Sequence, residues 1–191
     1  MKSNSDIECK NDGEIESICS FNEWQTLNDT IMGGESQSNC FPIAEGLLLR
    51  GVLTQKNGGF VSCRSSLFSP PLNLSKYKGI KLSIDGEGHR MKFALKIKSS
   101  SLGLNNLFNK SISWITTFPT NKRGTSIILI PFSELIPSIR AKKVMFPAKF
   151  DPSSITRFQL LYSKFDLPGK INNEFKDGDF QILLRSINAY S

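Results

Sequence analysis

The stretch GIKLSIDGEGHRMKFALKI, residues 79–97, decides the fold class of this chain. Large apolar residues occupy alternate positions from 80 to 84 and, after a Gly-x-Gly turn, again from 93 to 97. Because successive side chains of a strand point to opposite faces of a sheet, this period of two predicts two strands joined by a hairpin turn. Each strand is expected to place one face in a core and the other in water.

Strand and turn signals continue on both sides of this stretch. Asn57-Gly58 favours a type I′ turn, whose central positions need positive φ, so residues 46–54 and 60–64 are expected to form a hairpin. Further strands are predicted at residues 112–118, 125–130, 156–163 and 179–187. Frequent prolines in the second half exclude long helices, and only residues 132–136 are expected to make a helical turn. The pattern predicts an all-β protein, a single jelly-roll β-sandwich.

The length of 191 residues fits one domain with a sizeable core. Residues 1–20 are polar and acidic, and we expect them to form a flexible, disordered N-terminal tail before a jelly-roll domain at 21–191. Residues 99–111 and 136–152 are predicted to be long loops. Long loops on a rigid sandwich are where binding usually takes place.

Composition limits the function classes. The net charge is +7, and because residues 1–18 carry −3, residues 19–191 carry +10, although no basic run exceeds two residues. The four cysteines include no C-x-x-C pair and there is a single histidine, so neither a clustered zinc site nor another cofactor is expected. No secretory segment, transit peptide or bilayer-spanning run is found. We therefore expect a cytoplasmic protein with four free thiols.

Three arrangements suggest catalysis, and each has a structural alternative. Gly86-x-Gly88 resembles part of a dinucleotide fingerprint but lacks the third glycine and the following helix, so a hairpin turn is favoured. His89 lies in that turn and is expected to be a surface residue. Asp29 and Glu35 supply the two carboxylates that glycoside hydrolysis needs, or two calcium ligands, but their spacing alone favours neither role.

A row of basic residues follows from the alternation. Lys92, Lys96 and Lys98 are expected to point away from the core, and Arg64, two strands earlier, to lie on the same face. Such a face is either a solvated surface or a contact surface for an acidic partner. The lysine strand shows no outward aromatic residue, which disfavours sugar stacking and single-stranded nucleic acid.

The segment NDTIMGGES, residues 28–36, places two glycines beside an Asn-Asp pair. Glycine admits backbone conformations closed to other residues and lets a second backbone come close. We expect a bend at Met32-Gly33-Gly34, with Trp24 and Met32 as apolar plugs that fold the N-terminal segment onto the sandwich. Asn28 and Asp29 are expected to bond to neighbouring backbone in that turn.

The chain resembles the complex I intermediate-associated protein 30 family over about residues 21–190. The segments that carry the resemblance are Trp24, NDTIMGGES, NGGFVSCR, LNLSKYKGIKLSIDGEGHR, IPFSEL, DPSSITRFQLLYSKF and DFQILLRSINAY. The resemblance implies a galactose-binding-like jelly roll, close to carbohydrate-binding modules. It also implies a role in assembly of respiratory complex I, or as a domain of proteins that support photosystem assembly, and no catalysis.

We therefore predict a non-catalytic, protein-binding assembly or chaperone-like factor for a membrane redox complex of complex I or photosynthetic type. Its partners would be protein subunits of that complex, with no nucleic acid and no integral membrane segment; peripheral membrane association and oligomeric state stay open. The candidate partner-binding residues are Asn28, Asp29, Met32, Gly33, Gly34, Arg64, Lys92, Lys96 and Lys98. A carbohydrate-binding module is the alternative, and a hydrolase that uses Asp29 and Glu35 is the third hypothesis.

Overall fold

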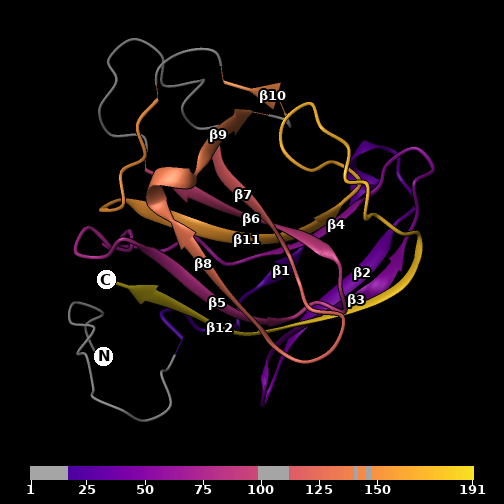
Figure 1. Cartoon of the computed structure of the whole chain (residues 1–191), viewed down its shortest axis with the longest axis horizontal. Helices are drawn as coiled ribbons and strands as arrows, with labels where there is room; N and C mark the ends of the chain where they lie inside the picture. The colour runs from indigo at the N-terminus through magenta and orange to yellow at the C-terminus, as the bar shows by residue number, and fades with distance from the viewer. Residues whose placement is uncertain (1–16, 99–111, 140–141, 145–147) are drawn as a thin grey trace.

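Two antiparallel sheets stack face to face in the computed structural model (Figure 1), which describes residues 17–98, 112–139, 142–144 and 148–191. One sheet has the strand order β1 (Gln25–Thr26), β4 (Phe60–Arg64), β11 (Ile155–Ser163), β6 (Arg90–Ile97), β7 (Ser113–Pro119), β9 (Ile136–Ile139) and β10 (Lys142–Lys143). The other has the order β2 (Gln37–Ile43), β3 (Gly46–Leu53), β12 (Gly178–Tyr190), β5 (Gly79–Asp85) and β8 (Ser126–Pro131). Among the described residues, helix is confined to the 3-10 turns η1 (Asp29–Met32) and η2 (Phe132–Glu134). The predicted all-β jelly roll is confirmed.

The core lies between the two sheets, where the alternating apolar residues meet. Ile80, Leu82 and Ile84 of β5 are fully buried, and so are Phe93 and Leu95 of β6 in the opposite sheet. Burial of each such side chain stabilises the fold by roughly 1.5–3 kcal/mol. The period of two therefore predicted correctly which face of these strands is interior.

Both predicted hairpins are wrong, although both turns exist. Asn57 and Glu87 adopt positive φ of 55° and 53°. The turn at Asn57 joins β3 to β4 and the turn at Glu87 joins β5 to β6, and in each case the two strands belong to different sheets. Turn residues set only the local reversal of the chain, whereas pairing is decided by distant strands: β3 pairs with β2 and β12, and β4 with β1 and β11. The two turns thus carry the chain from one layer to the other.

Some strands lie where none was predicted. β9 and β10 occupy part of the expected loop 136–152, but they are too short for a clear alternation, and residues 140–141 and 145–147 lie outside the described residues. β2 contains Pro42 and is an edge strand, which is where a sheet tolerates a proline. The expected loop 99–111 also lies outside the described residues.

The expected tail falls mostly outside the described residues, but its last part belongs to the domain. Ile18 donates its backbone N–H to the Ile187 carbonyl at 2.7 Å, and the Ser17 hydroxyl donates to the same oxygen at 3.1 Å. Ser17 and Ile18 are therefore tied to β12. In the part of the chain that the structure describes, no helix has the length and apolar character needed to cross a membrane.

Candidate functional site

The carboxylate of Asp29 is the centre of the Met-Gly-Gly segment and is completely buried. It accepts hydrogen bonds from the Ser36 N–H (3.0 Å), the Ser36 hydroxyl (2.7 Å), the Gly59 N–H (2.6 Å) and the Phe60 N–H (3.3 Å). Burial alone would raise the pKa of Asp29, but these hydrogen bonds to the charged form outweigh it and hold the pKa below its usual value. An ionised carboxylate therefore ties η1 to the turn between β3 and β4.

Gly34 and Gly58 form the walls of this niche. A Cβ atom at either position would collide with the Asp29 carboxyl group. Gly33 meets a different need, because it closes the 3-10 turn with a φ of +84° and has open space around it. Gly34 and Gly58 thus allow the close approach of Asp29, whereas Gly33 supplies a left-handed backbone conformation.

Asn28 fastens the same segment to β2. Its side-chain amide donates to the Ser38 carbonyl at 3.3 Å, and its amide oxygen accepts from the Ser38 hydroxyl at 2.6 Å. Asn28 and Asp29 both bond to backbone, as expected, but their partners lie at Ser36, in β2 and in the β3–β4 turn rather than within the bend itself. The expectation that Asp29 itself contacts a partner is corrected, since its side chain lies in the interior and its oxygens are already occupied.

The turn held by Asp29 presents two large apolar side chains to solvent. Ile31 is 65% exposed and Met32 is 74% exposed. The prediction that Met32 plugs the domain is therefore wrong, whereas Trp24 is buried as predicted and donates its indole N–H to the Ser20 carbonyl at 3.1 Å. Exposed apolar side chains on a well-anchored backbone are typical of protein contact sites.

Asp29 and Glu35 do not form a catalytic pair. Glu35 is exposed and makes a 2.8 Å ion pair with Lys56, while Asp29 is enclosed by its own donors. Glycoside hydrolysis needs both carboxyl groups open to one cleft, so the geometry does not support the hydrolase hypothesis. Among the described residues, no group of three or more His, Cys, Asp or Glu side chains is placed so that it could hold a metal ion.

The expected basic face lies on the outside of the seven-stranded sheet. Arg64 of β4 is the register partner of Gln159 in β11, and Lys96 of β6 is the register partner of Arg157 in the same strand. Arg64 and Lys96 therefore share a face, as predicted, with β11 between them. Sequence reasoning missed Arg157, although its alternation with the buried Phe158 placed it outward.

The arginines of this face carry donors without partners. The Nε atoms of Arg64 and Arg157 are buried and have no hydrogen-bond partner. Burial, and then repulsion by Arg64, lowers the pKa of Arg157; burial, and then repulsion by Arg157, lowers the pKa of Lys96. Within the described ranges, no ion pair joins either arginine to a carboxylate. Among the described residues, Arg64 and Arg157 therefore bring positive charge to this face without an ion pair.

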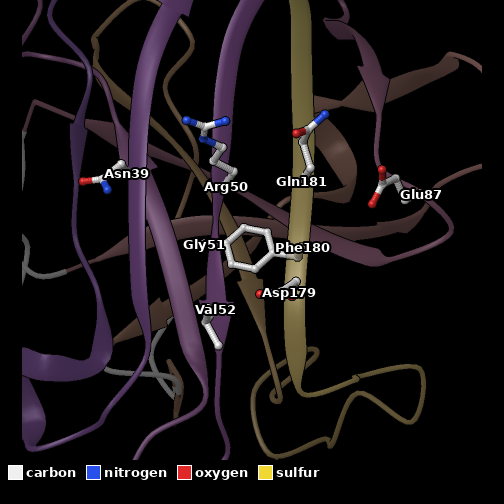
Figure 2. A pocket seen from close by; sticks show the side chains of 8 residues that line it. All are labelled: Asn39, Arg50, Gly51, Val52, Glu87, Asp179, Phe180 and Gln181. Atoms are coloured by element: carbon white, nitrogen blue, oxygen red, sulfur yellow. The ribbon is translucent and has the colours of Figure 1, made fainter.

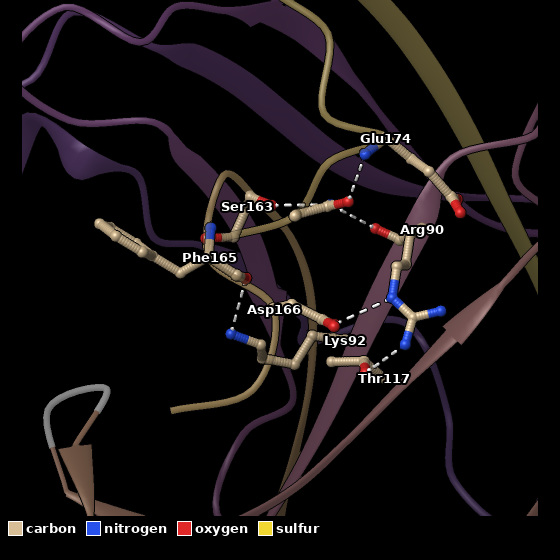
Figure 3. Close-up of polar contacts among 8 residues, drawn as sticks. Arg90, Lys92, Thr117, Ser163, Phe165, Asp166 and Glu174 are labelled. Atoms are coloured by element: carbon tan, nitrogen blue, oxygen red, sulfur yellow. Dashed lines mark hydrogen bonds and ion pairs between the residues drawn. The ribbon is translucent and has the colours of Figure 1, made fainter. Parts of the chain in front are cut away.

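Lys92 is engaged in a different contact (Figure 3). Its Nζ donates to the Phe165 carbonyl at 3.0 Å, beside the 3.0 Å ion pair of Arg90 with Asp166, so it fastens the β11–β12 loop onto β6. Burial lowers the pKa of Lys92 to about 8, although Asp166 acts in the opposite direction. Lys92 points away from the buried Phe93, as expected, but its ammonium group is engaged within the chain by the Phe165 carbonyl. Lys98, at the end of β6, is exposed as predicted.

A shallow hollow of about 460 Å³ lies on the five-stranded sheet (Figure 2). It is lined by Asn39, Arg50, Gly51, Val52, Glu87, Asp179, Phe180 and Gln181. These residues come mainly from β2, β3 and β12, and sequence reasoning missed the hollow because β2 was not predicted. Its lining has charges of both signs and no tryptophan or tyrosine.

The aromatic residues are mostly interior. Trp24, Trp114 and Tyr162 are buried, and Tyr77 and Tyr190 are half-buried. His89, expected at the surface, is half-buried with its ring 4.5 Å from the Tyr162 ring, and burial lowers its pKa. The chain therefore offers no fully exposed tryptophan or tyrosine for stacking on a sugar.

The described cysteines are all free thiols: Cys19, Cys40 and Cys63. Cys40 of β2 and Cys63 of β4 hydrogen-bond to each other across the two sheets, and this bond lowers the pKa of Cys40 although burial opposes it. Burial raises the pKa of Cys63 well above its usual value. The prediction of free thiols is confirmed for these three cysteines, while Cys9 lies outside the described residues.

Similar solved structures share this fold. The family 11 carbohydrate-binding module of a cellulosomal cellulase from Clostridium thermocellum matches with a TM-score of 0.64 at 13% identity, covering 96% of each chain. A family 11 module from the same organism, in complex with a β-1,3-1,4-mixed-linked tetrasaccharide, matches with a TM-score of 0.63 at 16% identity, covering 93% of this chain and 94% of that one. At such low identities the likeness shows the fold alone.

Sequence relatives are more informative. An uncharacterised protein of Schizosaccharomyces pombe is 27% identical over 177 residues, covering 87% of this chain and 77% of that protein. Residues 13–184 match the family described as complex I intermediate-associated protein 30, and this range includes the Asp29 niche and the basic face. The chain belongs to the complex I intermediate-associated protein 30 family.

Proposed function

We propose that this protein is a non-catalytic, chaperone-like assembly factor that binds protein subunits of a membrane redox complex of complex I type. The observation that carries the proposal is the family match over residues 13–184, which relates the chain to complex I assembly. The protein would act at the membrane periphery on the cytoplasmic side, without a cofactor. Catalysis has no role in this proposal, because the one carboxylate pair considered for it is not open to a substrate.

Two surfaces support protein binding. Ile31 and Met32 stand exposed on a turn that the buried Asp29 carboxylate holds in place. Lys98, Lys96 and Arg64 supply positive charge on the outside of the seven-stranded sheet. An apolar anchor contributes affinity, and complementary charge contributes rate and specificity.

Affinity purification from native membranes, followed by mass spectrometry, tests the proposal. The tagged full chain should enrich subunits of a membrane redox complex over a tag-only control. A Lys96/Lys98→Glu variant should recover fewer of these subunits, and a Met32→Ser variant should do the same by removing the apolar contact. Neither change removes a fully buried side chain, so both variants should remain folded by circular dichroism.

The matched control is Lys122/Arg123→Glu, which makes the same charge change in the exposed turn between β7 and β8. This control should recover the subunits as the unmodified chain does. If the unmodified chain enriches no redox-complex subunit, the proposed function is wrong. If the control loses the subunits as fully as the Lys96/Lys98→Glu variant, binding depends on overall charge and not on this face.

The fold of the family 11 modules favours sugar binding as a second candidate, because one of them was solved with a bound tetrasaccharide. The buried positions of Trp24 and Trp114 weaken it. Calorimetric titration of the purified chain with the mixed-linked tetrasaccharide separates the two functions. Heat of binding that disappears on an Arg50→Ala change in the hollow of Figure 2 would establish the sugar-binding function.

A further inference from the structure

Two buried guanidinium donors on the outside of the seven-stranded sheet are left without an acceptor. They are the Nε atoms of Arg64 and Arg157. An unpaired buried polar group costs free energy, and native proteins rarely keep one without a reason such as a ligand. A pair of them on neighbouring strands therefore indicates a site that accepts an external acceptor group.

The register brings the two arginines close together. Arg64 lies opposite Gln159, and Arg157 is two residues from Gln159 on the same face of β11. Diagonal neighbours of this kind are roughly 7–8 Å apart in an antiparallel sheet, within reach of long side chains. Lys96 lies opposite Arg157 on the far side, so three cations form one oblique row across β4, β11 and β6, which lie side by side in Figure 1.

The charges of this row repel one another. Burial is the larger cause of the lowered pKa of Arg157 and of Lys96, and repulsion adds to it, from Arg64 on Arg157 and from Arg157 on Lys96. Within the described residues, the ion pairs are Lys56–Glu35, Arg90–Asp166 and Arg185–Asp85, so neither Arg64 nor Arg157 is paired with a carboxylate there. A bound anion would relieve both the repulsion and the unpaired donors.

We propose that Arg64, Arg157 and Lys96 form a carboxylate-binding site that receives an Asp or Glu side chain of a protein partner. The planar guanidinium groups suit a carboxylate, because each can donate two parallel hydrogen bonds to its two oxygens. This assignment rests on the proposed function for the identity of the partner, but not for the chemistry of the site.

The recessed position of the donors favours a single side chain over a membrane surface. Both Nε atoms are buried, and burial is the main cause of the lowered pKa of Arg157 and of Lys96. A carboxylate on a flexible stem can enter such a site. A bilayer presents a broad plane of headgroups and would instead engage exposed cations such as Lys98.

Titration of the purified full chain with a capped hexaglutamate peptide tests the site, with hexaglutamine as the neutral control. The chain should bind hexaglutamate, and affinity should fall roughly tenfold or more in an Arg64→Lys/Arg157→Lys variant, which keeps the charge but loses the planar fork. The control variant Lys122→Gln/Arg123→Gln should bind as the unmodified chain does. Equal binding by the Arg→Lys variant would overturn the site.

A second variant keeps the test independent of folding defects. Gln159→Glu places a carboxylate of this chain beside Arg64, so it should abolish hexaglutamate binding, although it gives up the 3.0 Å hydrogen bond that the Gln159 amide donates to the Ser62 hydroxyl. Gln159→Ala loses the same hydrogen bond without adding a carboxylate, so it should melt lower than Gln159→Glu and keep peptide binding. If Gln159→Glu binds the peptide as the unmodified chain does, the site is wrong.

Two further probes separate other ligands from the proposed one. Inorganic phosphate that binds more tightly than the peptide, with the same dependence on the two arginines, would reassign the site to free phosphate. Vesicles of phosphatidylcholine with phosphatidylglycerol that bind while the peptide does not would reassign it to a membrane surface. Peptide binding in this assay without subunits in the native purification would leave the site intact and refute the assembly role.

Discussion

The Oδ2 atom of Asp29 accepts a 2.6 Å hydrogen bond from the backbone N–H of Gly59, thirty residues further along the chain. Gly59 in turn accepts a backbone hydrogen bond from Lys164 at 2.8 Å. The buried carboxylate thus joins the segment before β2 to the β3–β4 turn, and the Gly59 carbonyl joins that turn to the β11–β12 loop. The Asn-Asp pair and the Gly-Gly pair of the sequence therefore belong to one hydrogen-bonded anchor of this segment.

Replacing Asp29 with Asn should destabilise the domain by about 2–3 kcal/mol, because the amide presents donors to N–H groups that would then lack acceptors. Denaturation in urea at pH 7 measures this difference. Glu35→Gln, on the exposed neighbour, should change stability by less than about 0.5 kcal/mol. An Asp29→Asn protein as stable as the unmodified one would contradict the role given to this carboxylate.

The two glycines of the motif should differ in their tolerance of a side chain. Gly34→Ala should cost about 2–3 kcal/mol, since its Cβ collides with the Asp29 carboxyl group and displaces its hydrogen bonds. Gly33→Ala should cost only about 1 kcal/mol, the strain of a left-handed conformation in open space. Thermal melts of the two variants give the order, and the reverse order would show that the niche is described incorrectly.

Lys92 should make stability rise with pH in the alkaline range. Its pKa falls from 10.5 to about 8 on folding, so between these values the unfolded chain binds more protons and each rise in pH favours the folded state. Between pH 8 and pH 10, the free energy of unfolding should therefore rise more for the unmodified chain than for Lys92→Met. Parallel pH profiles of the two proteins would show that the Lys92 ammonium group is not perturbed.

The thiols should differ in reactivity in the folded protein. Among the three described cysteines, Cys40, whose pKa is lowered by the hydrogen bond from Cys63, should be alkylated first by iodoacetamide. Cys19, whose pKa burial raises to about 12, and the fully buried Cys63 should react only after denaturation. Peptide mass mapping over a time course reports this order, and early modification of Cys63 would contradict it.

Alternation predicted the strands but not their partners. The apolar faces of β5 and β6 follow from a local period of two, which any sheet arrangement would satisfy. Whether a turn such as that at Asn57 returns the chain to the same sheet depends on strands that are distant in the sequence, including β11 and β12. Pairing therefore could not be predicted from the turn residues.

Some features of the candidate site could likewise be predicted from the sequence, and others could not. The Met-Gly-Gly bend could be predicted, because few other residues adopt the backbone conformations that glycine allows in such a bend. The position of Asp29 was not, since a charged residue between polar neighbours gives no sign that Gly34 and Gly58 will enclose it. The outward position of Arg157 could have been predicted from the buried apolar residues on either side of it in β11. That prediction requires assigning every residue of the strand to one of its two faces.

The strand order also determines when this domain can form on the ribosome. β11 lies between β4 and β6 in one sheet, and β12 lies between β3 and β5 in the other. Until residues 155–190 have emerged, the nascent chain can form only separate ribbons such as β2–β3 and β5–β8, and isolated ribbons are marginally stable. Folding should therefore follow translation rather than accompany it, and the unfinished chain should itself depend on general chaperones that bind nascent apolar segments.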